Sequence, residues 1–126
     1  MISVVFYKTD GGKIKKVEIS GHSGAGDPGE DLICASASTI LYTAVGSIEE
    51  LCHLSGFYRI VEDSDGESMP FAEVWLPESS ESSQIDKAHI ILQVMEVGYK
   101  QLEQTAVSES GEYFVQVREI QYNQEV

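Results

Sequence analysis

The sequence predicts an α+β fold, a two-layer sandwich in which two helices pack on a mostly antiparallel sheet in the order β-β-α-β-β-α-β. Three observations support this: a pair of alternating segments at the N-terminus, two long stretches with helical apolar spacing, and turn residues between the segments. The chain has 126 residues, of which 42% are hydrophobic. That is enough for a packed core, and we expect a single domain over residues 1–126.

The first two strands should form an N-terminal hairpin. Apolar and other side chains alternate over residues 2–8 and again over residues 14–20, and Asp10-Gly11-Gly12 between them is a turn sequence. The side chains expected on the apolar face of this hairpin are Ile2, Val4, Phe6, Val17 and Ile19.

A first helix is expected from Leu32 to Leu54. Its apolar residues recur at steps of three and four and should form one buried face, made of Ile33, Ala37, Ile40, Ala44, Ile48 and Leu51. Asp31 is suited to the N-cap, and Gly56 is suited to the C-terminal stop.

The second half of the chain should add three strands and one helix. Strands are expected over residues 57–62, 71–76 and 113–120, and a helix over residues 84–106. The turn at 63–66 lacks the ligand spacing of a calcium loop, so we reject a calcium site. The buried seam expected for the second helix is Ile85, Ala88, Leu92, Met95, Tyr99, Leu102 and Ala106.

The charge and hydropathy of the chain exclude several classes of protein. Eight basic residues against 21 acidic ones give a formal net charge of −13. Because phosphate backbones are bound by Lys and Arg, direct nucleic-acid binding is not expected, whereas a basic peptide would be attracted. No apolar run approaches the roughly 20 residues of a membrane helix, and the N-terminus lacks a secretion signal. We therefore expect a cytoplasmic protein without a membrane partner.

The two cysteines should not form a disulfide bond within the chain. Cys34 and Cys52 are 18 residues apart, which along one helix corresponds to roughly 27 Å. A disulfide needs Cα atoms within about 7 Å. Free thiols agree with a reducing compartment, and Cys52 is expected to be a small buried side chain near the helix end.

The stretch from Gly21 to Ser38 carries the candidate chemistry, and three interpretations compete for it. The first is phosphate binding, because Gly24, Gly26 and Gly29 satisfy G-x-G-x-x-G between a strand and a helix. The preceding strand belongs to a hairpin instead of a parallel unit, and acidic residues in the loop would repel a pyrophosphate. We reject this interpretation and expect no cofactor.

The second interpretation is a metal site made of His22, Cys34, Cys52 and His53. The sequence has no C-x-x-C or H-x₃-H spacing, and a continuous helix would hold Cys52 and His53 far from Cys34. We expect no metal.

The third interpretation is a cysteine nucleophile with a histidine base. Cys34 should lie in the first turn of a helix, where the dipole and unpaired N–H groups favour a thiolate, and the loop could bring His22 beside it. Acidic residues in the same loop, Asp27, Glu30 and Asp31, act against a thiolate unless one of them orients the imidazole. A lone cysteine in a helix is more often a core residue, so the residue types alone leave this open.

The run G-H-S…G-x-D-L-I-C-A-S-A-S resembles the G-H-x…D-x-V-C-A-x-x-S signature of the ribosomal-processing cysteine proteases, the Prp or YsxB-like family. The resemblance extends over nearly the whole chain in length, acidity and element order. It implies that Cys34 is the nucleophile and His22 the general base. Gly21, Asp31 and Ser38 match further motif positions with less settled roles, a cap or a His-orienting carboxylate for Asp31 among them.

The resemblance also implies a function and partners. In that family the enzyme removes a short N-terminal extension from a bacterial large-subunit ribosomal protein, is a homodimer, and has a mobile loop over the site. The expected partner is therefore the basic N-terminal peptide of a ribosomal protein. The alternative is a non-catalytic acidic module that binds a basic ribosomal protein during ribosome assembly.

Overall fold

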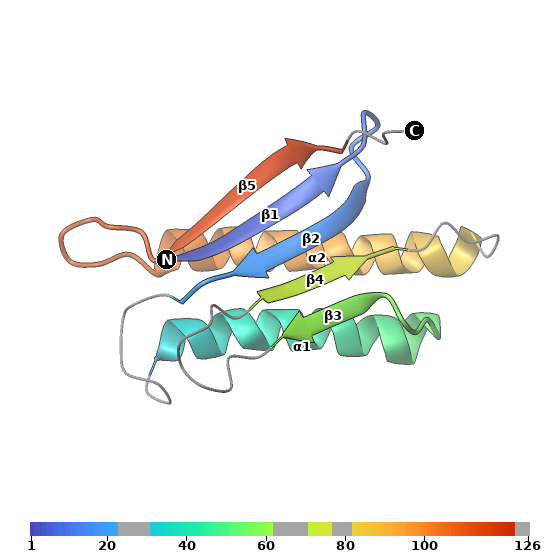
Figure 1. The fold of residues 1–126 in the computed structure, drawn as a ribbon, viewed down its shortest axis with the longest axis horizontal. Helices are drawn as coiled ribbons and strands as arrows, with labels where there is room; N and C mark the ends of the chain where they lie inside the picture. The colour runs from blue at the N-terminus through green and yellow to red at the C-terminus, as the bar shows by residue number, and fades with distance from the viewer. Residues whose placement is uncertain (23–30, 62–70, 77–81, 123–126) are drawn as a thin grey trace.

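The fold is described from a computed structural model, which covers residues 1–22, 31–61, 71–76 and 82–122. Seven elements follow in the predicted order (Figure 1). They are β1 (Ile2–Lys8), β2 (Ile14–Ser20), α1 (Leu32–Cys52), β3 (Tyr58–Val61), β4 (Phe71–Trp75), α2 (Ser82–Thr105) and β5 (Val115–Gln121). The predicted calcium-like turn at 63–66 and most of the loop before α1 lie outside the described residues.

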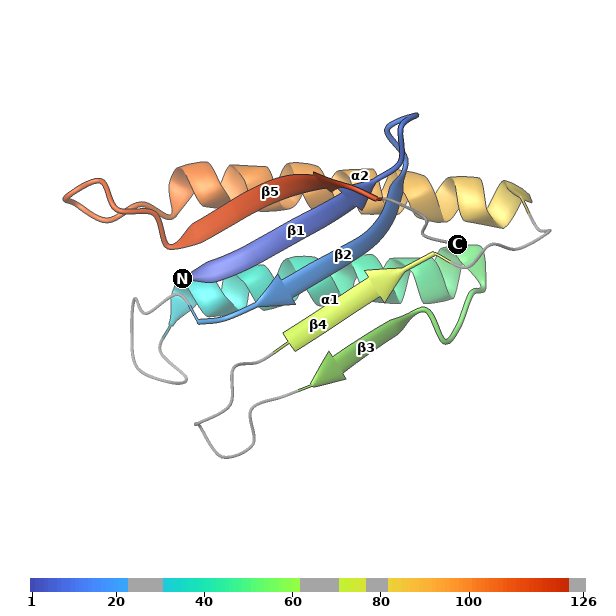
Figure 2. The same ribbon diagram turned by 45° about the horizontal axis from the view of Figure 1, so that its top comes forward.

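The five strands form one sheet in the order β3-β4-β2-β1-β5. The β1–β2, β2–β4 and β3–β4 pairs are antiparallel, whereas β5 runs parallel to β1. The sheet is thus mixed and mostly antiparallel, as predicted. Because β5 pairs with β1, the first and last strands of the chain lie side by side in the sheet (Figures 1 and 2).

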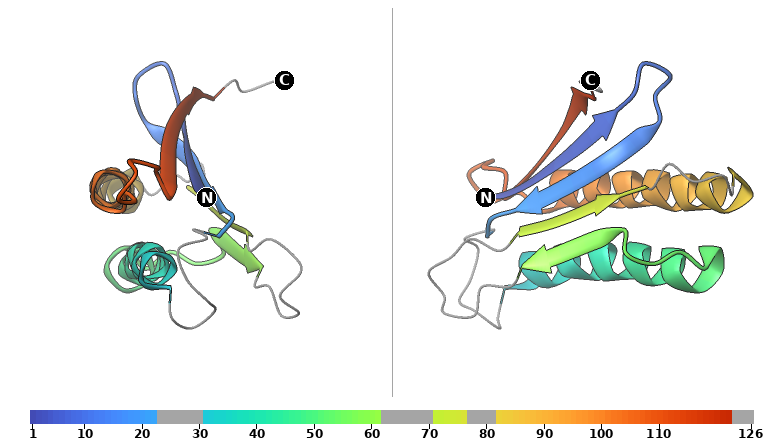
Figure 3. Two further views of the ribbon diagram at one scale, coloured as in Figure 1. Left: turned by 90° about the vertical axis from the view of Figure 1, so that its left-hand side faces the viewer. Right: turned by 45° about the vertical axis from the view of Figure 1, so that its right-hand side comes forward.

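Both helices cover the same face of the sheet, which leaves the other face without a helical layer (Figure 3). Strand side chains that point toward the helices alternate with outward ones, and many are fully buried, among them Val4, Phe6, Val17, Val74 and Val115. The two-layer sandwich predicted from the sequence is confirmed.

The first helix begins where the sequence predicts but ends two residues earlier. Asp31 is the N-cap, and the last helical residue is Cys52 instead of Leu54. His53 then has a left-handed backbone with φ 55°, and Gly56 has a positive φ of 70°, so the chain turns away within four residues.

The buried face of α1 is also rotated relative to the prediction. Leu51 is 65% exposed, whereas Cys52 is fully buried, so the expectation for Leu51 is wrong. The apolar residues of this helix allow steps of either three or four, and the core selects the stripe that continues from Ile48 to Cys52. The buried side chains of α1 are Ala37, Leu41, Ala44, Val45, Ile48 and Cys52.

By length and composition α1 could cross a membrane, with 21 residues and a mean hydropathy of 1.3. The prediction that no apolar run approaches this length is therefore wrong. A core helix of a soluble protein meets the same criterion, and one face of α1 packs in the core. The expectation of no membrane partner stays a prediction.

The second helix buries the predicted seam. Its members Ala88, Leu92, Met95, Tyr99 and Ala106 are buried, and Ile85 and Leu102 pack partly against them. The Tyr99 hydroxyl donates a hydrogen bond of 2.9 Å to the Ala37 carbonyl of α1, which ties the two helices together inside the core. His89 anchors the same helix to the sheet, because its Nε2 accepts a 3.0 Å hydrogen bond from the N–H of Ile14.

Candidate active site

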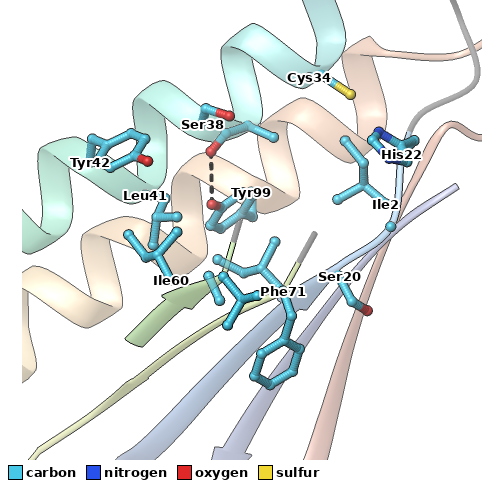
Figure 4. A pocket seen from close by; sticks show the side chains of 15 residues that line it. Ile2, Ser20, His22, Cys34, Ser38, Leu41, Tyr42, Ile60, Phe71 and Tyr99 are labelled. Atoms are coloured by element: carbon cyan, nitrogen blue, oxygen red, sulfur yellow. Dashed lines mark hydrogen bonds between the residues drawn. The ribbon is translucent and has the colours of Figure 1, made fainter. Parts of the chain in front are cut away.

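A pocket of about 250 Å³ opens where the end of β2, the start of α1 and the β3–β4 pair meet. His22 and Cys34 both line it (Figure 4). The Cys34 sulfur is directed toward the side of the pocket on which the His22 ring lies. The structure therefore brings the two residues of the cysteine–histidine interpretation to one cavity.

The first turn of α1 positions Cys34. The Asp31 carboxylate oxygen Oδ1 accepts hydrogen bonds of 3.0 Å from the N–H groups of both Ile33 and Cys34. This is the N-cap geometry expected of an aspartate, and it places Cys34 at the third helical position. The sulfur consequently lies close to the positive end of the helix dipole.

The same cap occupies backbone N–H groups at the start of α1 that could otherwise bind a substrate. The N–H groups of Ile33 and Cys34 are already bonded to Asp31. An oxyanion that needed those two donors would have to displace the carboxylate. As they stand, these two N–H groups are therefore not available to an oxyanion.

Gly21 directs the chain from β2 toward His22. Its φ is 93°, in the left-handed region that glycine adopts without strain, and it lies between the last residue of β2 and His22. Both Gly21 and His22 line the pocket, and the His22 side chain is solvent-exposed. A side chain at position 21 would be strained in this conformation, which explains why a glycine precedes the histidine.

Ser38 lies one helical turn after Cys34 on the same side of α1. It lines the pocket and is exposed (Figure 4). All five residues singled out from the sequence are therefore at this site: four line the cavity, and Asp31 caps the helix that carries Cys34.

The rest of the cavity consists of residues that the sequence reasoning did not assign to a site. They come from β1, β2, both helices, β3 and β4, and include Ile2, Leu41, Tyr42, Ile60, Phe71 and Tyr99. Tyr99 was predicted only as part of the buried helix seam. Its complete burial raises the pKa of its hydroxyl, so it stays a neutral donor to the Ala37 carbonyl.

The described lining of the pocket is mostly apolar and carries no carboxylate, ammonium or guanidinium group. Acidic side chains were expected to hold a basic substrate. Two of those acids, Asp27 and Glu30, lie outside the described residues, and Asp31 is engaged in capping. The cavity itself is therefore suited to an apolar side chain.

Cys52 differs from Cys34 in its exposure to solvent. Neither cysteine is in a disulfide bond, but Cys52 is fully buried whereas Cys34 is partly exposed. Burial raises the pKa of Cys52 above its usual value, and Lys87 opposes this only in part. Cys52 is thus the small core residue that the sequence predicts.

Within the described ranges, no three His, Cys, Asp or Glu side chains gather to hold a metal ion. The expectations of no metal and no cofactor stay predictions.

A pocket lined by both a cysteine and a histidine is the arrangement that a cysteine peptidase needs, and comparison with known proteins gives that class. The family model described as cysteine protease Prp matches residues 1–109. The chain therefore belongs to the cysteine protease Prp family.

Two curated relatives have the same name, ribosomal processing cysteine protease Prp. The one from Staphylococcus aureus is 32% identical over 104 residues, which cover 82% of this chain and 90% of the relative. The one from Bacillus subtilis is 26% identical over 102 residues, covering 79% and 91% respectively.

Solved structures give the same fold. A crystal structure of a Streptococcus mutans protein superposes with a TM-score of 0.74 at 22% identity, covering 97% of this chain and 96% of that one. The S. aureus protease Prp in complex with a covalently linked product peptide superposes with a TM-score of 0.69 at 25% identity, covering 94% and 99%.

Proposed function

We propose that this protein is a cysteine endopeptidase that removes the N-terminal extension of a bacterial large-subunit ribosomal protein, with Cys34 as nucleophile and His22 as general base. The observation that carries the proposal is that both residues line one pocket at the start of α1. The relatives' name, ribosomal processing cysteine protease Prp, supports a substrate connected with the ribosome.

The reaction would follow the usual course of thiol proteases. His22 accepts the proton of the Cys34 thiol, and the thiolate attacks the carbonyl carbon of the scissile bond. As the C–N bond breaks, the imidazolium gives the proton to the leaving amine, and Cys34 keeps the acyl group as a thioester. Water, deprotonated by His22, then attacks the thioester and releases the carboxylate product and the free thiol.

The pocket next to Cys34 would select the substrate by an apolar side chain. Its lining includes Leu41, Ile60 and Ala72, and its volume of about 250 Å³ can hold one large side chain. The overall charge of −13 would attract the basic remainder of a ribosomal protein tail.

The in vivo test is mass spectrometry of ribosomal proteins from cells depleted of this protein. We expect one large-subunit protein to keep additional N-terminal residues, and the added mass identifies the cleavage site. Unchanged N-termini in depleted cells would overturn the proposed substrate.

The in vitro test uses a peptide that spans that cleavage site. Wild-type protein should cleave it, whereas Cys34→Ala and His22→Ala should not, and Cys52→Ala serves as the matched control with full activity. Binding of the peptide without cleavage by the wild type would favour the alternative, a non-catalytic module for a basic ribosomal protein.

We also propose that the enzyme acts as a homodimer in the cytoplasm. A face of the sheet is left without a helical layer. Tyr7 and Trp75 both pair with Lys16. Because they lie next to the buried Phe6 and Val74, these two partly exposed aromatic residues point to that open face. Light scattering during size-exclusion chromatography should give twice the chain mass, and a monomer at micromolar concentration would contradict this.

A further inference from the structure

The outer edge of β3, beside the pocket, presents backbone groups that the sheet does not use. β3 is a terminal strand and pairs only with β4. The N–H of Trp75 donates a 2.8 Å hydrogen bond to the Phe57 carbonyl, which makes these two residues a hydrogen-bonded pair of the antiparallel ladder. Because such pairs alternate, the N–H and C=O groups of Tyr58 and Ile60 point away from the sheet. Within the described ranges, no residue bonds to them.

This open edge is continuous with the pocket. Ile60 pairs with Ala72 on the face that the helices cover, and both line the cavity that Cys34 also lines (Figure 4). An extended chain laid along β3 would direct every second side chain toward α1 and the mouth of the pocket. The backbone groups of Ile60 would then hold the chain against the pocket that Cys34 also lines.

At the opposite edge of the sheet, an outward backbone N–H is bonded to a side chain. In β5 the N–H of Val117 points outward, and the Glu103 carboxylate on α2 accepts a 2.6 Å hydrogen bond from it. A helix side chain therefore binds one donor in the middle of that edge, which is a common way to prevent unwanted strand pairing. The β3 edge has no such cover from the described residues, and it is the edge that reaches the pocket.

The length of the open edge indicates its occupant. β3 has only 4 residues, two of which present outward groups, so it offers a short ladder instead of the long edge typical of sheet-to-sheet association. Two solved structures of the S. aureus relative contain a product peptide and a substrate peptide. A peptide is thus a better match than a second copy of the chain.

We propose that the substrate binds as an added strand on β3, paired through the outward N–H and C=O groups of Tyr58 and Ile60. This pairing inserts one substrate side chain into the pocket that Cys34 also lines. The inference rests on the proposed function, because it describes how the same site recognises its substrate.

The first test is a series of substrate peptides, each with one backbone amide N-methylated. Methylation removes a donor and blocks strand pairing, so positions that face β3 should lose about fivefold or more in kcat/KM. Positions between them, whose amides face away, should change little. A sensitivity that repeats every second residue is the expected result.

The second test changes the edge itself. Ile60→Pro removes the outward N–H without removing a bond to β4, and Ile60→Ala removes the side chain but keeps the N–H. We expect the proline variant to have a KM at least about fivefold higher than the alanine variant. The matched control is Gln121→Pro on β5, whose N–H also faces outward because the neighbouring Tyr122 N–H bonds to Lys8 of β1.

The outcomes separate this inference from the proposed function. If the wild type cleaves no unmodified peptide, the proposed function is wrong. If it cleaves, but methylation has the same effect at every position and the Ile60→Pro and Ile60→Ala variants have equal KM, the added-strand proposal is wrong. Equal thiol alkylation rates at Cys34 in both variants verify that the site is intact. A proline variant that loses dimerisation but keeps its KM would assign the edge to a second copy and also overturn the proposal.

Discussion

At the scale of single residues, the two cysteines of one helix have opposite environments. Cys34 is partly exposed in the first turn of α1 and lines a cavity with His22, whereas Cys52 is fully buried at the end of the helix. The thiolate is the reactive form, so position decides which thiol can act as a nucleophile. The sequence alone suggests this difference, and the burial of each residue establishes it.

Alkylation with iodoacetamide should therefore distinguish the two thiols. We expect Cys34 to react at least about tenfold faster than Cys52 in the native protein, because a buried thiol with a raised pKa is protonated and inaccessible. Peptide mapping by mass spectrometry after short reaction times measures both rates. Equal rates in folded protein would contradict the assignment, and equal rates in denaturant are the control.

At the same scale, Asp31 combines two effects that act in opposite directions on Cys34. Its carboxylate caps the helix that carries the thiol, and its negative charge opposes a thiolate. An asparagine keeps a capping oxygen without the charge, so substitutions at this position can separate the two effects.

We expect Asp31→Ala to lower the free energy of unfolding by about 1 kcal/mol, and Asp31→Asn to lower it much less. Denaturant unfolding of both variants measures the difference. An asparagine variant as unstable as the alanine variant would show that the cap is not what Asp31 contributes.

At the scale of elements, α2 is held to the rest of the fold by specific polar contacts as well as by its apolar seam. His89 accepts a hydrogen bond from the Ile14 N–H at the start of β2, and the Tyr99 hydroxyl donates to Ala37 of α1. Neither contact could be predicted from the sequence, because each joins residues more than 60 positions apart.

The contact at His89 predicts a pH-dependent stability. Burial, followed by the charge of Lys13, lowers the pKa of His89 below 6.5, and the neutral ring is the form that can accept the Ile14 hydrogen bond. The folded state thus binds fewer protons than the unfolded state. The stabilisation is present above pH 6.5 and is lost as the pH falls through the lowered pKa.

His89→Ala should consequently be destabilised by about 1 kcal/mol at pH 7.5, and less at pH 5. Urea unfolding at the two pH values measures both differences. A difference that is the same at both pH values would mean that the ring acts only by packing.

The apolar spacing of the sequence predicts the buried residues of α2 better than those of α1. The seam of α2 is confirmed because its members keep one regular spacing of alternating steps of three and four, although Ile90, Val94 and Val97 between them are apolar and exposed. In α1 apolar residues are dense, and steps of three and four both fit, so the sequence could not distinguish Leu51 from Cys52. The contacts of α1 with the sheet and with α2 determine which of the two residues is buried.

At the scale of the whole molecule, the sequence predicts the elements and their layers but not the way the last strand joins the sheet. β5 pairs in parallel with β1, the first strand, and nothing local in residues 113–120 specifies this. The pocket depends on the same long-range arrangement, because its walls come from six elements. The residue motif could locate Cys34 and His22, but not the apolar side chains that complete the cavity.

A charge network at the parallel edge joins β1, α2 and β5. Lys8 and Lys100 each contact the carboxylates of Glu96 and Glu119, at distances of 2.8 to 3.3 Å. Hydrogen bonds first with Lys8, and then with Glu96 and Lys100, lower the pKa of Glu119 from 4.5 to about 2. The stabilisation is therefore present above pH 4.5 and is lost as the pH falls toward 2.

Glu119→Gln should lower the free energy of unfolding at pH 7 by less than about 1 kcal/mol, because the Glu119 side chain is half-exposed and solvent screens the pairs. The difference from the wild type should shrink between pH 4.5 and pH 2. Thermal unfolding across this range measures it, and a difference that does not change with pH would contradict the role of the network.

The proposed function requires that Cys34 forms the acyl intermediate of the peptidase reaction. The most direct measurement is mass spectrometry of the intact protein, quenched in acid after mixing with the substrate peptide. We predict a covalent adduct with the mass of the N-terminal product, mapped to Cys34 and absent from the Cys34→Ala variant. Cleavage without any adduct on Cys34, or equal cleavage by Cys34→Ala, would contradict it.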